Sequence, residues 1–488
     1  MLVVVVALFL VWQFWPASGG SSHAADASAT SRPSGHHHAS RGSGFGPDSP
    51  IKHVVFIVKE NRTFNTYFAT YGHGAVGSTS GGTLVCRGTV CSPGPDYKLK
   101  PAPDVQPHDI THGFSSGLYA INGGRMNGFN IIGDGQDMTG YVYHDRSSIP
   151  NYWAYADRFV LADHFFTSMY GPTFPEHLYT VAAQSDGIID NKDSTDHPGN
   201  YCDDPTEYTE HFRDDLTDNQ KKQIMYYEDH YTDDFPNMIY KISPFWEQIR
   251  TCINVKTLPD ELQAAGVSWK YYANHDQWMN GLQAIRHVRF DPAMWAKVQP
   301  PENFIRDVRA GHLPSVSWLI PPESYNEHPG EGVSVCAGEN WTVEQINAIM
   351  RSRYWPSTVI VVVWDDFGGF YDPVVPPHYD IMGLGPRTPA LIISPYTRRG
   401  NNPDGGTVDH TVYEFASVLR LVEGLHGLRP LTDRDRQASP LAGALDFSQP
   451  PDLKPLILKL RQDCPYGNSF AEMLPGSPAV RGVGVPWG

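Results

Sequence analysis

The chain has 488 residues, 40% of them hydrophobic and 12% aromatic, which is enough for a large buried core and argues against disorder. Its formal net charge is −16, and this charge repels nucleic-acid backbones and anionic membranes at long range. The composition therefore excludes a nucleic-acid partner. It fits a solution enzyme that uses divalent cations, with one large α/β domain or two ordinary ones.

The N-terminus has the pattern of an export signal. Residues 2–15 are almost continuously apolar, and residues 25–29 carry small side chains that suit a cleavage site. The apolar run is too short for a comfortable transmembrane helix, and no basic residues precede it. We assign residues 1–29 to a signal peptide or an uncleaved N-terminal anchor, and we predict a secreted or cell-envelope protein.

Residues 30–50 are rich in Ser, Gly and His, which predicts a flexible linker. The run from His36 to His38 could bind a metal adventitiously, but a linker is the better interpretation.

The cysteine count agrees with export. An even number of cysteines in an exported protein favours disulfides, although six allow 15 pairings. Cys86 and Cys91 bracket a short turn and are the best candidates for a local pair. The other four are Cys202, Cys252, Cys336 and Cys464.

Residues 51–450 have the pattern of one large domain. Short apolar, β-branched runs predict strands at residues 53–58, 267–272, 315–320, 358–364 and 390–394. Helices are predicted at residues 257–266, with Thr257 as N-cap and Gly266 at the end, and at residues 410–425, with Asp409 near the cap. Strands that alternate with helices predict a three-layer α/β/α sandwich with a mostly parallel central sheet.

Two segments differ from this pattern. Residues 185–245 are dense in Asp, Glu, Tyr and His, which predicts an inserted cap with a solvated face rather than a metal site. Its tyrosines and Phe212 either line a lipid entrance or form a small core of their own, and the second interpretation is favoured. Residues 451–488 form a Pro-rich tail with one short helix predicted at residues 453–461, and Cys464 is a possible anchor for it.

Acidic and amide side chains follow two of the predicted strands. Glu60 and Asn61 come directly after the first strand, and Asp365 and Asp366 come directly after the fourth. Because ligands bind outside the carboxyl ends of parallel strands, both pairs are expected at one edge of the sheet. Their oxygen atoms can share a hard divalent cation, and the alternative is that they cap helices.

The segment Tyr170-Gly171-Pro172-Thr173 supplies a candidate nucleophile. Gly and Pro restrict the backbone, so the Thr173 hydroxyl can be held rigidly beside a metal, which lowers its pKa. The alternative, favoured for Thr173 alone, is that it caps the following turn. Candidate acids are His112, His108 and His328, although a single loop histidine is more often structural.

Six sequence blocks, in order, resemble those of the bacterial phosphoesterases that include non-specific phospholipases C and acid phosphatases. The resemblance covers roughly residues 50 to 430, and that family has an alkaline-phosphatase-like α/β/α fold. The blocks are KENRTFNTYF, ADHFFTSMYGPTFPEHLY, SWLIPPESYNEHPG, VIVVVWDDFGGFYDPVVPP, GLGPRTPALIISPYTRRG and VDHTVYEFASVLRLVE.

The resemblance implies roles for the candidate residues. Thr173 would be the nucleophile and would also contact the metal, while His112 and His328 would bind phosphate or serve the leaving group, with His108 as a weaker substitute for His112. The metal ligands would be Glu60, Asn61, Asp365 and Asp366. An oxygen-rich set without cysteine favours one Ca²⁺, Mg²⁺ or Mn²⁺ ion.

The chain departs from the family pattern at four places. Asp366 stands where many members have Glu, which shortens the reach of the carboxylate. Phe367 and Pro373 stand where many members have His, and His378 is only a weak candidate to replace the second of these. Glu176 and His177 replace Asn and Arg, which would weaken contact with an anionic substrate.

The predicted function is metal-assisted hydrolysis of phosphoric esters through a phosphothreonine intermediate. A phospholipase C acting on phosphatidylcholine or a related diester is the first interpretation, with transient contact to a membrane surface. An acid phosphatase acting on small monoesters is the alternative. Because Phe367 and Pro373 replace histidines, a degenerate protein that binds phosphorylated ligands without turnover is a third. The oligomeric state cannot be inferred from the sequence.

Overall fold

The computed structural model describes residues 45–133, 138–192, 200–234 and 237–464. The predicted signal segment, most of the linker and the end of the tail lie outside these residues. Among the described residues, no helix has both the length and the apolar character needed to cross a bilayer.

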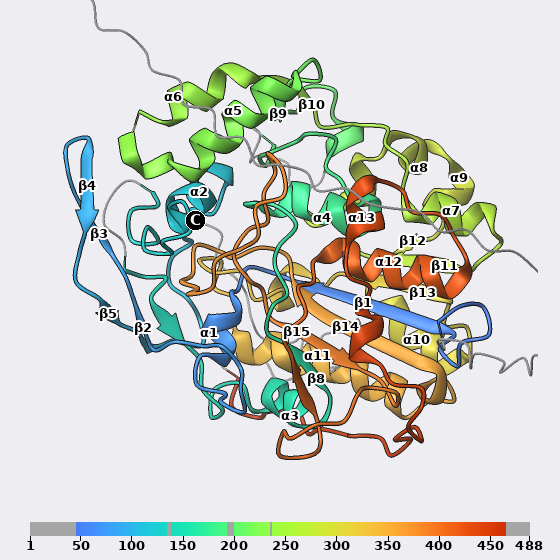
Figure 1. The fold of residues 1–488 in the computed structure, drawn as a ribbon. Coiled ribbons are helices and arrows are strands. Elements are labelled where there is room, and N and C mark those ends of the chain that lie inside the picture. Colours follow the sequence, from blue (N-terminus) through green and yellow to red (C-terminus); the bar gives the residue numbers. More distant parts are fainter. Residues whose placement is uncertain (1–44, 134–137, 193–199, 235–236, 465–488) are drawn as a thin grey trace, which may run out of the picture. The chain divides into compact units, whose positions relative to one another are not determined.

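An eight-stranded sheet lies at the centre (Figure 1). All neighbouring strands run parallel except β15, which is antiparallel to both of its neighbours, so the other seven strands end at the same edge. In spatial order the strands are β12 (Val298–Gln299), β11 (Trp269–Tyr272), β13 (Val316–Leu319), β1 (His53–Lys59), β14 (Thr358–Trp364), β15 (Ala390–Ile393), β8 (Val160–Ala162) and β16 (Thr407–Asp409).

Both faces of the sheet are buried, which explains why its long strands are continuously apolar. In β1, Val54 and Phe56 pack into one core, whereas Val55 and Ile57 pack into the other. Helices cover each face, so the molecule has the predicted three-layer α/β/α architecture.

The helices divide between the two faces, as Figure 1 shows. On the face of Val55 lie α1 (Phe64–Phe68), α3 (Pro150–Arg158), α10 (Glu302–Ala310) and α11 (Val335–Met350). On the face of Val54 lie α2 (Phe114–Ile121), α4 (Thr173–Ala182), α7 (Leu258–Ala264), α8 (Arg286–Phe290), α9 (Pro292–Trp295) and α12 (Phe415–His426), with α13 (Asp433–Gln437) packed against α12.

Residues 185–245 contribute α5 (Asp218–Asp229), α6 (Ile239–Ile242) and β9 (Tyr208–Phe212), which pairs with β10 (Trp246–Arg250). Three of its aromatic side chains are buried in the main core, namely Tyr201, Phe212 and Tyr231, whereas Tyr208 and Tyr226 are exposed. The favoured interpretation, a small core of the insertion's own, is therefore wrong for these three, which belong to the main core. The boundaries of the cap stay a prediction.

Short pairs of strands lie outside the main sheet. They are β2 (Ser80–Gly81) with β5 (Tyr97–Lys98), β3 (Leu84–Arg87) with β4 (Val90–Pro93), and β6 (Lys100–Pro101) with β7 (Val142–Tyr143). A disulfide joins Cys86 in β3 to Cys91 in β4, as predicted. The others are Cys202–Cys252 and Cys336–Cys464.

Two helix predictions need correction. The tail segment predicted as a helix, residues 453–461, forms no helix or strand. Its backbone is bonded by side chains of α11, and Asn347 bonds both the N–H and the C=O of Leu458. Helix α12 begins at Phe415, and its N-cap is Glu414 in a capping box rather than Asp409. The predicted anchor of the tail is confirmed, since Cys464 is bonded to Cys336 in α11.

Candidate active site

The two acidic pairs predicted from the sequence meet at the carboxyl edge of the sheet. Glu60 and Asn61 follow β1, Asp365 and Asp366 follow the neighbouring β14, and all four side chains are fully buried or nearly so. Oδ1 of Asp365 accepts hydrogen bonds from the backbone N–H groups of Asn61, at 3.0 Å, and of Asp366, at 2.7 Å. The ends of the two strands are therefore locked together.

Thr173 is the first residue of α4, and its hydroxyl faces these carboxylates. Its Oγ1 lies 3.3 Å from Oε2 of Glu60 and 3.3 Å from Oδ2 of Asp366. The N-cap of α4 is Pro172, so Thr173 does not occupy the capping position that the alternative interpretation gave it. The start of a helix favours negative charge, which suits an attacking alkoxide and a phosphoryl group.

The backbone before Thr173 needs a glycine. Gly171 has a φ of +110°, and a Cβ at this position would lie 2.5 Å from the carbonyl oxygen of His112. This close approach brings the loop of the predicted acid against the loop of the predicted nucleophile.

The site contains more negative charge than its described surroundings neutralise. Burial, together with the neighbouring carboxylates, raises the pKa of Asp365 and the pKa of Glu60 well above their usual ranges. Oδ2 of Asp365 and Oδ1 of Asn61 are buried without a hydrogen-bond partner among the described residues. Unpaired oxygens beside three carboxylates are the ligands that a divalent cation would use, so the residues fit the predicted metal.

Sequence reasoning missed a further candidate metal ligand, His177. His177 is fully buried, with Nε2 lying 3.1 Å from Oε1 of Glu60 and 3.7 Å from Oδ2 of Asp365. Ligand atoms of these three residues lie within 4.8 Å of one another. The available signal was the spacing, because His177 follows Thr173 by four residues and therefore lies on the same face of a helix.

Burial lowers the pKa of His177 to about 3, so its imidazole is neutral and can bind a cation. Its neighbour Glu176 is also buried and accepts hydrogen bonds from the N–H groups of Ser168 and Met169. The replacement of Asn and Arg at these two positions therefore changes the interior of the site rather than an exposed substrate contact.

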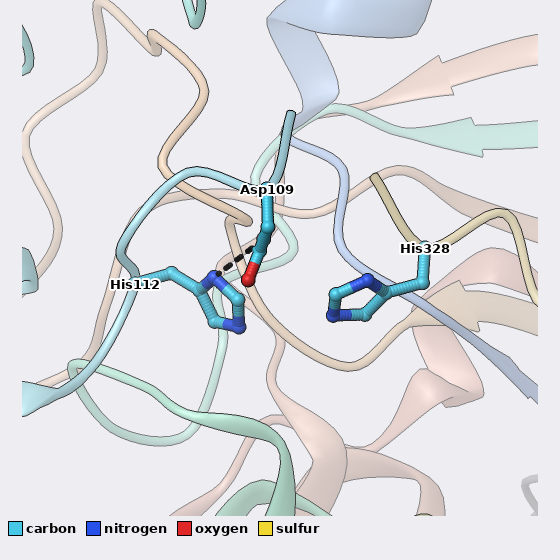
Figure 2. Close-up of side chains that lie close together, drawn as sticks. All are labelled: Asp109, His112 and His328. Atoms are coloured by element: carbon cyan, nitrogen blue, oxygen red, sulfur yellow. Dashed lines mark ion pairs between the residues drawn. The ribbon is translucent and has the colours of Figure 1, made fainter. Parts of the chain in front are cut away.

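The two predicted acids face the same space from different loops, with Asp109 beside them (Figure 2). The rings of His112 and His328 have centroids 5.7 Å apart, and Nε2 of His112 lies 2.9 Å from Nδ2 of Asn61. In each ring Nδ1 contacts a backbone carbonyl, of Ile110 for His112 and of Pro329 for His328, which leaves Nε2 for other partners. His108 is exposed and stays outside this group.

The pKa values of these two histidines are shifted in opposite directions. Burial opposes the charged form of His112, but the carboxylates of Asp366 and Asp109 raise its pKa to about 9. Burial and the neighbouring His112 lower the pKa of His328 to about 3. The protonated imidazole of His112 can donate a proton, and the neutral imidazole of His328 can hydrogen-bond a ligand.

A buried carboxylate, Glu327, holds three segments of the site. It accepts hydrogen bonds from Trp364 Nε1 at 2.9 Å, Tyr152 at 2.6 Å and Tyr67 at 2.5 Å, and it forms an ion pair with Lys59 Nζ at 3.0 Å. Lys59 directly precedes Glu60, Trp364 directly precedes Asp365, and Glu327 itself directly precedes His328. The network therefore sets the relative positions of two candidate metal ligands, Glu60 and Asp365, and of His328.

The residues at two of the departures from the family pattern, Phe367 and Pro373, leave the site without the histidines that many members have there. Phe367 is buried in the core, and its ring lies 3.4 Å from the Cβ position of Gly171. His378 bonds Glu228 and Asp229 of α5 and lines a different cavity, so it does not replace the histidine that Pro373 removes.

The site opens into a cavity of about 360 Å³. No Lys or Arg is present among the residues that the structure shows lining it. They are Glu60, Asp109, His112, Thr173, Asn191, Trp278, Met279, Glu323, Asn326, His328 and Glu331.

Comparison with known proteins decides the family. A model of the Phosphoesterase family matches residues 51–429. The chain belongs to this family. The resemblance predicted from the six sequence blocks is thus confirmed, and the phosphoesterase is a hydrolase of phosphoric esters. The family is metal-dependent, in agreement with the ligand groups described above.

Similar proteins are found in bacteria and plants. Phospholipase C A of Mycobacterium tuberculosis (strain H37Rv) is 26% identical over 466 residues, which cover 82% of this phosphoesterase and 78% of the relative. The hemolytic phospholipase C of Pseudomonas aeruginosa is 26% identical over 449 residues, covering 78% and 54%. Non-specific phospholipase C6 of Arabidopsis thaliana is 24% identical over 467 residues, covering 86% and 74%.

Among solved structures, a protein of the alkaline phosphatase superfamily from Vibrio parahaemolyticus covers 70% of the chain at 11% identity, with a TM-score of 0.30.

Proposed function

We propose that this phosphoesterase is a phospholipase C-like phosphodiesterase in which Thr173 is the nucleophile. The observation that carries the proposal is the position of the Thr173 hydroxyl, 3.3 Å from carboxylates at the ends of both central strands and at the start of α4. The names of the similar phospholipases C support this choice of reaction.

The metal would be held by Glu60, Asn61, Asp365, Asp366 and His177. A bound divalent cation would polarise the phosphoryl group and lower the pKa of the attacking hydroxyl. Of the three predicted ions, Mn²⁺ best accepts an imidazole together with carboxylates, so we propose Mn²⁺.

Each protein residue would have a defined role in the two chemical steps. The Thr173 hydroxyl attacks phosphorus and passes its proton to Asp366, while His112 donates a proton to the departing alkoxide. In the second step water attacks phosphothreonine, neutral His112 accepts a proton from the water, and Asp366 returns its proton to Thr173. His328, which stays neutral, hydrogen-bonds a phosphoryl oxygen.

The charge of the cavity favours a diester over a monoester. A phosphomonoester carries nearly two negative charges at neutral pH, and a diester carries one. Asp109, Glu323 and Glu331 line the cavity, and all three would repel the second charge. The Trp278 ring offers a surface for an apolar or cationic alcohol group of a diester.

We also propose that the enzyme acts outside the cytoplasm, with residues 1–29 as its export signal. The three disulfides of the described residues support this location, because such bonds persist in oxidising compartments.

The test compares hydrolysis of p-nitrophenylphosphorylcholine with hydrolysis of p-nitrophenyl phosphate, with and without EDTA. We expect preference for the choline diester, loss of activity with EDTA, and a fall in kcat of at least about 10³-fold for Thr173→Ala. Thr180→Ala is the matched control, because it removes the same type of hydroxyl from the same helix, and this hydroxyl donates to the backbone carbonyl of His177.

Retained activity of Thr173→Ala would rule out the nucleophile assignment. Preference for the monoester would make the protein a phosphatase. No cleavage of either substrate with Mn²⁺, Ca²⁺ or Mg²⁺ present would favour the degenerate binding protein.

A further inference from the structure

A second group of side chains with metal-binding chemistry lies at the same edge of the sheet. Strands β8 and β16 are parallel neighbours, and both end at the edge where β1 and β14 end. Asp163 follows β8 directly, and His410 follows β16 directly. The pair is separated from the catalytic pair by about three strand spacings, or ~14 Å, so it is not part of the catalytic site.

Asp163, His164 and His410 converge on one point. Nδ1 of His164 lies 2.7 Å from Oδ1 of Asp163, and Nδ1 of His410 lies 2.8 Å from the same oxygen. The rings have centroids 5.9 Å apart and stand nearly perpendicular to each other. Ligand atoms of all three residues lie within 4.8 Å of one another.

Hydrogen bonds hold Asp163 of this group in one position. The Asp163 side chain is fully buried, and its Oδ2 accepts a hydrogen bond of 2.9 Å from the N–H of Val76. The carbonyl oxygen of Asp163 accepts a hydrogen bond of 2.6 Å from Arg387, whose guanidinium also pairs with the carboxylate of Asp372. Oδ1 of Asp163 is therefore presented to the two imidazoles in one orientation.

The two imidazoles are open to solvent. The side chain of His164 is 24% exposed and that of His410 is 55% exposed, so a small ion can reach the group from outside. A solvent molecule could complete its coordination. One buried carboxylate oxygen with two imidazole nitrogens reproduces the donor set of three-ligand zinc sites, which keep their fourth position open.

We propose that Asp163, His164 and His410 form a second metal site that binds Zn²⁺. This donor set is richer in nitrogen than the catalytic one, in which carboxylate and amide oxygens predominate, so the two sites should prefer different ions. The ion would join the loops after β8 and β16. Asp163 lies ten residues before Thr173, so the same ion would fix the beginning of the segment that carries the nucleophile.

The test measures zinc content rather than activity. Because His36, His37 and His38 could bind zinc on their own, the parent protein is the full chain with these three replaced by Ala. Parent and variants are equilibrated at one free Zn²⁺ concentration, desalted, and measured by elemental mass spectrometry. Isothermal titration with Zn²⁺ gives the affinity.

We expect His410→Ala and His164→Ala each to bind one zinc equivalent fewer than the parent, with at least a tenfold lower affinity at this site. His312→Ala, which removes an exposed histidine after α10, serves as the matched control and should bind as much zinc as the parent. Circular dichroism without metal confirms that each variant is folded. Equal zinc content in the parent and in folded His410→Ala and His164→Ala would overturn the proposal.

Discussion

The network around Glu327 allows a quantitative test of how the site is positioned. Glu327 and Lys59 form an ion pair of 3.0 Å, and neither side chain is exposed. Glu327→Gln would remove the negative charge that pairs with the buried Lys59 ammonium, which also donates to the carbonyl oxygens of Tyr325 and Gly338. Removing one partner of a buried ion pair costs about 3–5 kcal/mol, so we expect the free energy of unfolding to fall by that amount.

A double-mutant cycle separates the pair from its surroundings. Lys59→Met leaves Glu327 with its three neutral donors and should cost less than Glu327→Gln. The double variant, which no longer contains an unpaired charge, should be more stable than the sum of the single changes predicts, by about 2–3 kcal/mol. Guanidinium unfolding followed by tryptophan fluorescence measures these values, provided that the slope m is the same for all variants.

Glu247→Gln serves as the control, because this carboxylate is 47% exposed and should change stability by less than about 0.5 kcal/mol. Single changes that add within about 0.5 kcal/mol would refute the reasoning. The same network positions Glu60 and Asp365, so Glu327→Gln should also lower kcat at temperatures where the variant is folded.

Two further predictions concern histidines. His177→Ala should raise the concentration of activating cation needed for half-maximal activity by at least about tenfold, and an unchanged titration curve would exclude His177 as a ligand. Burial opposes the charge on His378, but Glu228 and Asp229 raise its pKa to about 9, above the unfolded value of about 6.5. The stabilisation from this group is therefore complete below pH 6.5 and is lost as the pH rises through 9. The melting temperature should fall between pH 6 and 9.5 by more in the wild type than in His378→Gln, and parallel curves would contradict this.

The sequence predicted the long strands that are buried on both faces of the sheet most accurately. β14 spans the predicted residues, and β1 extends only one residue further, because five or six apolar residues in a row have few alternatives to a buried strand. β8, β12 and β16 were not predicted, since two or three residues cannot form a recognisable pattern. The helix prediction for the tail failed for another reason: asparagine side chains that are distant in the sequence bond its backbone, and no helix forms.

The candidate site, too, could be predicted only in part from the sequence. Residues placed directly after long strands could be assigned to one edge, and the structure brings Glu60, Asp365 and Thr173 together there. The role of His177 depends on the rotation of a helix against the sheet, which no local pattern specifies. The Glu327 network joins residues far apart in the chain, including Tyr67 and Tyr152, and only the folded chain reveals it.

The Cys336–Cys464 disulfide has a consequence for where the enzyme can mature. It closes a loop of 128 residues that contains β14 with its two aspartates and the whole of α12. In the chain-entropy account, a closure of this size destabilises the unfolded chain by about 5 kcal/mol. A chain kept in a reducing cytoplasm would fold without that contribution. Under the export that we propose, full stability would be reached only after the chain leaves the reducing cytoplasm, so the proposed phospholipase C-like activity would develop outside it.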